Sequence, residues 1–182
     1  MNAKSNRKSF LDFARLRKTT YEFSERKVKS SDVRKILEAG RWAPSPINSQ
    51  PWRFIVVRKK SKISRLVENA FYGYFHTAPS VIIALVLKKE SWKGTHRGVK
   101  NGKLGLYEAY LSMAMPALSM VYESLDLGID SCLLTPNPES VSRILRLEGD
   151  SVPLMVGFGY EKKGVFQRVR GRKSIDELTS YD

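Results

Sequence analysis

The chain has 182 residues, of which 42% are hydrophobic, and it carries a formal net charge of +14 at pH 7. That length suits one domain, or one subunit that shares its core with a partner, and the apolar content argues against disorder. No apolar run reaches the roughly 18–20 residues of a membrane span, and the polar start lacks the apolar segment of a signal peptide, so we expect a cytoplasmic protein.

The amino-terminal part predicts two helices, a strand and a third helix. Apolar residues at helical spacing predict a first helix over residues 9–17. Ser30 or Ser31 is a suitable N-cap for a second helix, whose inner face would carry Val33, Ile36, Leu37 and Gly40. Residues 53–58 predict a strand, and residues 61–71 a short helix.

The middle of the chain contains its most apolar segments. Seven consecutive apolar residues at 81–87 predict a strand buried on both faces. The polar segment 88–103 is a candidate surface loop or lid. Residues 104–127 predict a long helix that is apolar almost all round, that Pro116 kinks or divides, and that Gly128 ends.

The carboxyl-terminal part predicts two strands around a helix. Residues 129–134 and 154–160 are the strands. Between them, Asn137 and Pro138 occupy the N-cap and N1 positions of a helix that buries Val141, Ile144 and Leu145. The tail from Glu161 has no core pattern. Because strands and helices do not alternate regularly, the sequence predicts an α+β fold with a helix-flanked mixed sheet in one domain over residues 1–182.

The sequence lacks most signatures of side-chain catalysis. It has no phosphate-binding glycine loop, no His-Glu-x-x-His and no Cys-x-x-Cys. The lone Cys132 excludes an internal disulfide and is expected to be buried, and His76 and His96 have neither a triad nor a metal-ligand context. We therefore expect no catalytic side chain and no metal, and a cofactor that supplies the chemistry.

Residues 42–54 stand out as a stiff polar loop that leads into a strand. They read Trp-Ala-Pro-Ser-Pro-Ile-Asn-Ser-Gln-Pro-Trp-Arg-Phe. Each proline fixes its own φ and pushes the residue before it toward extended conformations. Hydroxyl and amide side chains on such a loop suit a flat polar ligand, although the same composition is also typical of an ordinary helix-to-strand connection.

Two segments carry a resemblance to a known family. Residues 17–23 read Arg-Lys-Thr-Thr-Tyr-Glu-Phe, and residues 42–52 read Trp-Ala-Pro-Ser-Pro-Ile-Asn-Ser-Gln-Pro-Trp. They resemble the Arg-Arg-Ser-x-Arg-x-Phe and Trp-Ala-Pro-Ser-x-x-Asn-x-Gln-Pro-Trp patterns of the nitroreductase family of FMN enzymes. Weaker similarity at residues 127–130, 157–160 and 170–173 extends the resemblance over nearly the whole chain.

The resemblance implies a fold, an assembly and a reaction. The fold is a mainly antiparallel sheet of the nitroreductase type, and the assembly is an interlocked homodimer whose termini, here residues 160–182, reach the partner subunit or the FMN phosphate. The reaction is an FMN-dependent transfer of a hydride from NAD(P)H through flavin N5 to a small acceptor. Nitroaromatics, quinones, flavins and enals all remain open as acceptors.

The resemblance also implies which residues contact FMN. It places the phosphate near cations and a hydroxyl from both ends of the chain, and the ring beside the polar loop. The matching residues are Arg17, Lys18, Thr19, Tyr21, Pro44, Ser45, Pro46, Asn48, Gln50, Tyr74, Leu134, Thr135, Pro136, Arg170 and Arg172. Tyr21 and Tyr74 depart from the residue types usual in the family. Trp52 is expected to serve packing instead.

Two alternatives remain. One is a flavin enzyme of the same fold with different chemistry: dehalogenation, flavin destruction or dehydrogenation. The other is a nucleic-acid-binding protein that has lost the cofactor, because residues 1–65 hold 18 Lys and Arg against 5 Asp and Glu, whereas the remainder holds 14 against 13. No known nucleic-acid-binding module accompanies this charge, so we do not expect nucleic acid to be the main partner.

Overall fold

The computed structural model describes residues 9–71, 77–88, 102–164 and 171–182, with the backbone alone for residues 102–106. Five α-helices, one 3₁₀ turn and five strands lie in these ranges. In chain order they are α1 (Phe10–Leu16), α2 (Ser30–Arg41), η1 (Pro46–Asn48), β1 (Trp52–Val57), α3 (Lys60–Glu68), β2 (Ala70–Phe71), β3 (Val81–Leu87), α4 (Gly102–Asp126), β4 (Asp130–Pro136), α5 (Pro138–Leu145) and β5 (Ser151–Gly159).

The strands form one sheet in the order β1-β3-β5-β4-β2, and every neighbouring pair is antiparallel. All seven residues of β3 are buried, which confirms the strand predicted over 81–87. Hydrophobic runs of this kind are typical of strands covered on both faces. The α+β class and the antiparallel character of the sheet are also confirmed.

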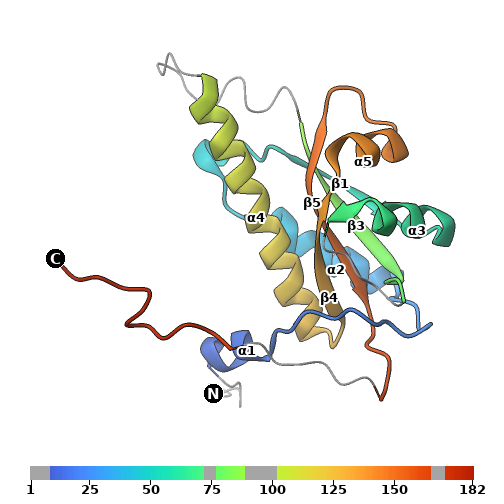
Figure 1. The fold of residues 1–182 in the computed structure, drawn as a ribbon, viewed down its shortest axis with the longest axis horizontal. Helices are drawn as coiled ribbons and strands as arrows, with labels where there is room; N and C mark the ends of the chain where they lie inside the picture. The colour runs from blue at the N-terminus through green and yellow to red at the C-terminus, as the bar shows by residue number, and fades with distance from the viewer. Residues whose placement is uncertain (1–8, 72–76, 89–101, 165–170) are drawn as a thin grey trace, which may run out of the picture.

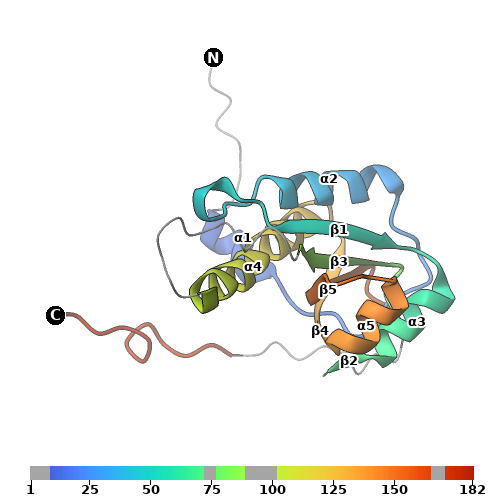
Figure 2. The same ribbon diagram turned by 90° about the horizontal axis from the view of Figure 1, so that it is seen from above.

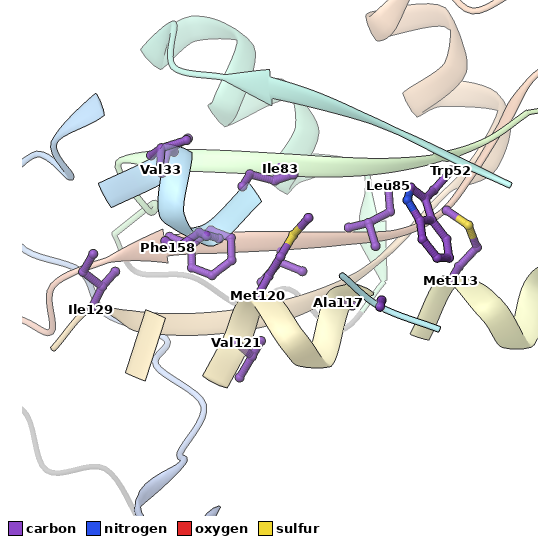
Figure 3. Packing of buried hydrophobic residues seen from close by; sticks show 14 of the residues in the cluster. Val33, Trp52, Ile83, Leu85, Met113, Ala117, Met120, Val121, Ile129 and Phe158 are labelled. Atoms are coloured by element: carbon purple, nitrogen blue, oxygen red, sulfur yellow. The ribbon is translucent and has the colours of Figure 1, made fainter. Parts of the chain in front are cut away.

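Helices cover both faces of the sheet. Helices α2 and α4 pack on one face, and α3 and α5 pack on the other (Figures 1 and 2). Between α4 and the sheet, Met113 and Met120 meet Trp52, Leu85 and Phe158 in the larger core cluster (Figure 3). Trp52 is buried there, so the prediction that it serves packing is confirmed.

Helix α4 runs unbroken through Pro116, so the predicted division of this helix is wrong. A proline removes one backbone donor at a cost of ~3 kcal/mol. Burial of Met113, Ala117 and Met120 on the same face offsets that cost. At the other end, the N–H groups of Gly128 and Ile129 donate to the carbonyls of Leu125 (3.1 Å) and Ser124 (2.8 Å), with Gly128 at φ 66°. The predicted glycine stop is therefore confirmed.

The predicted N-cap is confirmed for α5 and wrong for α2. Asn137 accepts from the Ser140 N–H at 3.1 Å and caps α5, as predicted. Helix α2 instead has Lys29 at its N-cap, so the prediction of Ser30 or Ser31 is wrong. The cause is non-local. The Val28 N–H donates to Ser80 Oγ (3.1 Å) and its carbonyl accepts from Arg58 (3.0 Å), which holds the chain extended and fixes where the helix begins.

The third helix is shorter than predicted. It ends at Glu68, whereas the pattern indicated residue 71. Ala70 and Phe71 pair instead with Pro136 and Thr135 as the edge strand β2. Local propensity cannot anticipate a pairing with residues so distant in sequence.

Candidate active site

The cluster at residues 17–19 directly follows the end of α1 at Leu16, in the segment that leads to the sheet. The Thr20 N–H donates to the Ser131 carbonyl at 3.0 Å, which fastens this segment to the start of β4. Helix α1 is held through Phe10 and Phe13, whose rings pack on Tyr122 near the end of α4. Non-local contacts thus fix the position of the predicted phosphate clamp.

The cations of this cluster are not equivalent. The Lys18 ammonium donates to the Glu161 carboxylate, which neutralises part of its charge. Arg17 has no salt bridge among the residues that the structure describes, and it is half-buried. Arg17 is therefore the stronger candidate for an anion, because its guanidinium is a planar fork that matches a phosphate.

Thr20 is a polar residue that sequence reasoning missed. Its side chain is fully buried, and Oγ1 has no hydrogen-bond partner within the described part of the chain. A buried hydroxyl without a partner costs about 1–3 kcal/mol. The signal was available in the sequence, since Thr20 directly follows the predicted clamp residue Thr19.

The segment 134–136 lies at the opposite end of the same strand. Six residues from Ser131 to Pro136 span about 17 Å at the rise of an antiparallel strand. Leu134 is buried, Thr135 is exposed, and Leu133 between the two ends is 50% exposed. Pro136 has no N–H, so within this segment it cannot supply the backbone donor expected near flavin N5.

The polar loop 44–50 is held in an unusual backbone conformation. Ile47, Asn48 and Gln50 all have positive φ (47°, 55° and 43°). Such angles are uncommon outside glycine, and they cluster where the surroundings enforce them. Ser45 Oγ accepts from the Gln50 N–H at 2.9 Å, and the Gln50 amide donates to Asn48 Oδ1 at 3.2 Å. The loop is thus cross-linked by its own side chains.

This loop and the clamp do not meet within one chain. Figure 1 shows α1 beside the carboxyl-terminal end of α4 and the 3₁₀ turn η1 toward its amino-terminal end. A helix of 25 residues is about 37 Å long. Of the predicted loop residues, Pro44, Pro46, Asn48 and Gln50 are exposed and Ser45 is half-buried, so they face outward from this chain.

The remaining predicted residues are scattered. Tyr21 is half-buried on the segment that follows the clamp. Arg172 lies on the exposed tail 171–182, which extends away from the body of the domain (Figures 1 and 2). Tyr74 and Arg170, like the histidines and most of the predicted lid, lie outside the described residues. With Arg170 outside the described residues, the two-ended clamp stays a prediction.

An open apolar face of α4 lies between the two halves of the site. Its exposed side chains recur at i, i+3, i+4, i+7, i+8 and i+11. They are Tyr107, Tyr110, Leu111, Ala114, Met115 and Leu118. The opposite face of the helix is buried, which accounts for the apolar pattern on all sides of the sequence. The exposed tail adds Ile175, Leu178 and Tyr181. Exposed apolar surface of this extent marks an interaction site.

Trp42 is held beside the loop by a charged neighbour. The Glu38 carboxylate accepts from the Trp42 indole (2.8 Å) and from Arg41 (2.6 and 2.8 Å). These bonds, with that from Arg41 the largest contribution, lower the pKa of Glu38 to about 2. The indole nevertheless stays 74% exposed. The i, i+3 and i, i+4 spacing of these residues on a helix could have indicated the cluster.

Cys132 is expected to be inert toward thiol reagents. It is buried, and desolvation raises its pKa to about 12. The reactive thiolate then makes up about 1 part in 10,000 at a pH near 8. Alkylation by iodoacetamide, followed by mass spectrometry, should be at least ~100-fold slower in the native protein than in denaturant. Equal rates would contradict the buried position.

Neither a metal centre nor a membrane segment is found in the described ranges. No group of three or more His, Cys, Asp or Glu side chains there could hold a metal ion. None of the helices in those ranges has both the length and the apolar character that a bilayer crossing requires.

Comparison with known proteins gives a family and a fold. The model of the nitroreductase family matches residues 14–76. A protein provisionally named the NAD(P)H nitroreductase YfkO, from Bacillus subtilis, is 25% identical over 94% of this chain and 96% of its own. A nitroreductase family protein of Streptococcus pneumoniae superposes with a TM-score of 0.81 at 24% identity, covering 96% of this chain and 100% of that one.

A further solved structure carries a ligand. It is a nitroreductase of Desulfovibrio desulfuricans in complex with FMN, with a TM-score of 0.78 at 22% identity over 97% of this chain and 98% of its own. The chain thus has the nitroreductase fold. Together with the match over residues 14–76, this confirms the resemblance to the nitroreductase family.

Proposed function

We propose that the protein is an FMN-dependent oxidoreductase that uses NAD(P)H to reduce a small acceptor. The observation that carries this proposal is the layout of β4. The segment that follows the clamp is hydrogen-bonded through Thr20 to Ser131 near the start of β4. The donor segment at Thr135 lies near the end of the strand, and the half-exposed Leu133 lies between them. A long planar cofactor with a phosphate at one end suits such a strip.

The donor set fits FMN. Arg17 and Thr19 offer a guanidinium fork and a hydroxyl to a phosphate, next to the unpartnered hydroxyl of Thr20. Leu133 offers an apolar surface to a ring. When bound, FMN would take up a hydride from a reduced nicotinamide and pass it to the acceptor. The role of this chain's residues is to bind, to orient and to exclude water, which agrees with the absence of a recognised catalytic motif in the sequence.

The site requires a second copy of the chain. The polar loop 44–50 and the clamp lie toward opposite ends of α4, and the apolar face of α4 lies between them. Two copies that pack through this face in antiparallel fashion would bring the loop of one to the clamp of the other. The exposed tail, with Arg172, could then reach the partner's site. A homodimer therefore both covers the apolar face and completes the site.

Removing the clamp guanidinium should weaken FMN binding. Charge-assisted hydrogen bonds contribute about 1.5–3 kcal/mol, so Arg17→Ala and Arg172→Ala should each lower FMN affinity by roughly tenfold to a hundredfold. Fluorescence titration of the flavin-free protein with FMN measures this. Arg15→Ala is the matched control, because Arg15 lies on the exposed face of α1 and pairs with Asp12. If only the Arg15→Ala control loses affinity, or if none of the three variants does, the assignment of Arg17 and Arg172 to the phosphate clamp is wrong.

A further inference from the structure

A cluster of positive charge in the described part of the chain lies away from the proposed flavin site. Segments 26–29 and 58–62 are far apart in sequence, but Arg58 donates to the Val28 carbonyl at 3.0 Å and joins them. Lys27, Arg58 and Lys60 also line one cleft of about 450 Å³. Figure 2 shows α2 and α3 both beginning at the end of the molecule toward which β1 points.

We name this region the basic corner and define it by six cations. They are Lys27, Lys29, Arg58, Lys59, Lys60 and Lys62. All are exposed except Lys62, which is half-buried. The acidic groups near them are Asp32 in the first turn of α2, and Glu68 and Glu25, which line the cleft. The Glu25 carboxylate is 4.0 Å from the Lys60 ammonium, with both side chains open to solvent. The corner therefore keeps a positive excess.

Helix stability does not explain these lysines. Lys59 and Lys60 lie at the N-cap and first position of α3, and the first turn of this helix has no acidic residue. Cations at this end oppose the helix dipole, which disfavours them by about 0.3–1 kcal/mol each. The exposed pair of Lys60 with Glu25 offsets little of this cost, since a solvated ion pair at 4.0 Å contributes at most about 1 kcal/mol. Residues that break a local rule with little compensation are expected where function requires them. A polyanion would supply that compensation.

We propose that the basic corner binds the phosphate backbone of double-stranded nucleic acid, without reading its sequence. Phosphates at regular spacing match a cluster of exposed lysines, and this contact alone gives substantial affinity. Single strands are typically held by stacking on aromatic residues, and none of the described residues that line the cleft is aromatic. Membrane-bound surfaces insert apolar side chains beside their cations, and segments 26–29 and 58–62 expose no large apolar side chain.

The corner stays accessible in the proposed dimer. It lies at the β1 edge of the sheet, whereas the strip along β4 lies further across the sheet, and none of the corner's six cations belongs to the open face of α4. Three strand spacings separate β1 from β4, or about 14 Å. Two copies of the corner would then double the number of phosphate contacts available to one duplex.

The test compares two triple variants with the same net charge. Lys59→Gln, Lys60→Gln and Lys62→Gln remove half of the corner. Arg143→Gln, Lys162→Gln and Lys163→Gln remove three exposed cations elsewhere, so that both proteins fall from +14 to +11. Binding of a short DNA duplex is measured by fluorescence anisotropy between about 50 and 200 mM salt. A double variant, Lys27→Gln with Lys29→Gln, repeats the test outside α3.

The corner variants should bind duplex at least ~10-fold more weakly than the parent protein. The slope of log affinity against log salt should fall by roughly 2–3 in the triple, because each phosphate contact contributes about 0.9. The control triple should lose less than ~3-fold. If corner and control variants lose the same duplex affinity, the loss follows from the net charge alone and the proposal is overturned. Tighter binding to single strands, or to phosphatidylserine vesicles, than to duplex would also overturn it.

Discussion

Replacing Leu111 and Leu118 with lysine is expected to convert the proposed homodimer into a monomer and to abolish FMN binding. The two side chains lie two turns apart on the open face of α4 and are 68% and 47% exposed in the single chain. Buried in an interface, each unpaired ammonium would cost several kcal/mol. Light scattering should give a mass near 20.7 kDa for the variant and near twice that for the parent.

Val56→Lys is the matched control for this double variant. Val56 is also an exposed apolar residue, but it lies on β1 at the other edge of the sheet. It should leave both the mass and the flavin content unchanged. A parent protein that is monomeric at every concentration and still holds FMN would exclude a shared site. So would a double variant that remains a dimer with its flavin.

Asn48→Ala is expected to lower FMN affinity, or slow reduction by NAD(P)H, by about tenfold or more. A buried amide partner lost at the flavin edge costs about 1–3 kcal/mol. Ser49→Ala should change either property by less than about threefold. Stopped-flow absorbance of the flavin measures the reduction rate, and fluorescence titration measures the affinity.

The backbone at Asn48 requires a second substitution. Its φ of 55° favours asparagine or glycine, so alanine would also add strain. Asn48→Gly keeps the backbone conformation and removes only the amide. It should reproduce the loss seen with alanine. If Asn48→Gly behaves like the parent, the effect belongs to loop strain, and if Ser49→Ala is the more damaging change, the assignment of this loop is wrong.

Most of the fold could be predicted because its signals are local. The apolar run of β3, the Asn137-Pro138 start of α5 and the Gly128 end of α4 each depend on neighbours within a few residues. The errors arose where distant residues decide. The start of α2 depends on Ser80 and Arg58, and the continuity of α4 through Pro116 depends on packing against the sheet.

The candidate site was less predictable for the same reason. The resemblance named the clamp and the loop, but only the structure places them toward opposite ends of α4. It also gives Lys18 a carboxylate partner in Glu161, 143 residues away, and places Arg172 on an exposed tail. The spacing of residues along the sequence does not predict which of these distant residues lie close together in space. The buried Thr20 hydroxyl likewise becomes informative only once burial is known.

The flavin content of the purified protein tests the central claim most directly. The protein is heated to release any bound flavin, which is identified by chromatography and counted against the amount of chain. We expect FMN rather than FAD, because the proposed clamp ends at a single phosphate. Each chain supplies one clamp, so the expected ratio is about one FMN per chain. Recovery of mostly FAD, or of no flavin even after the protein has been soaked in FMN, would contradict the account.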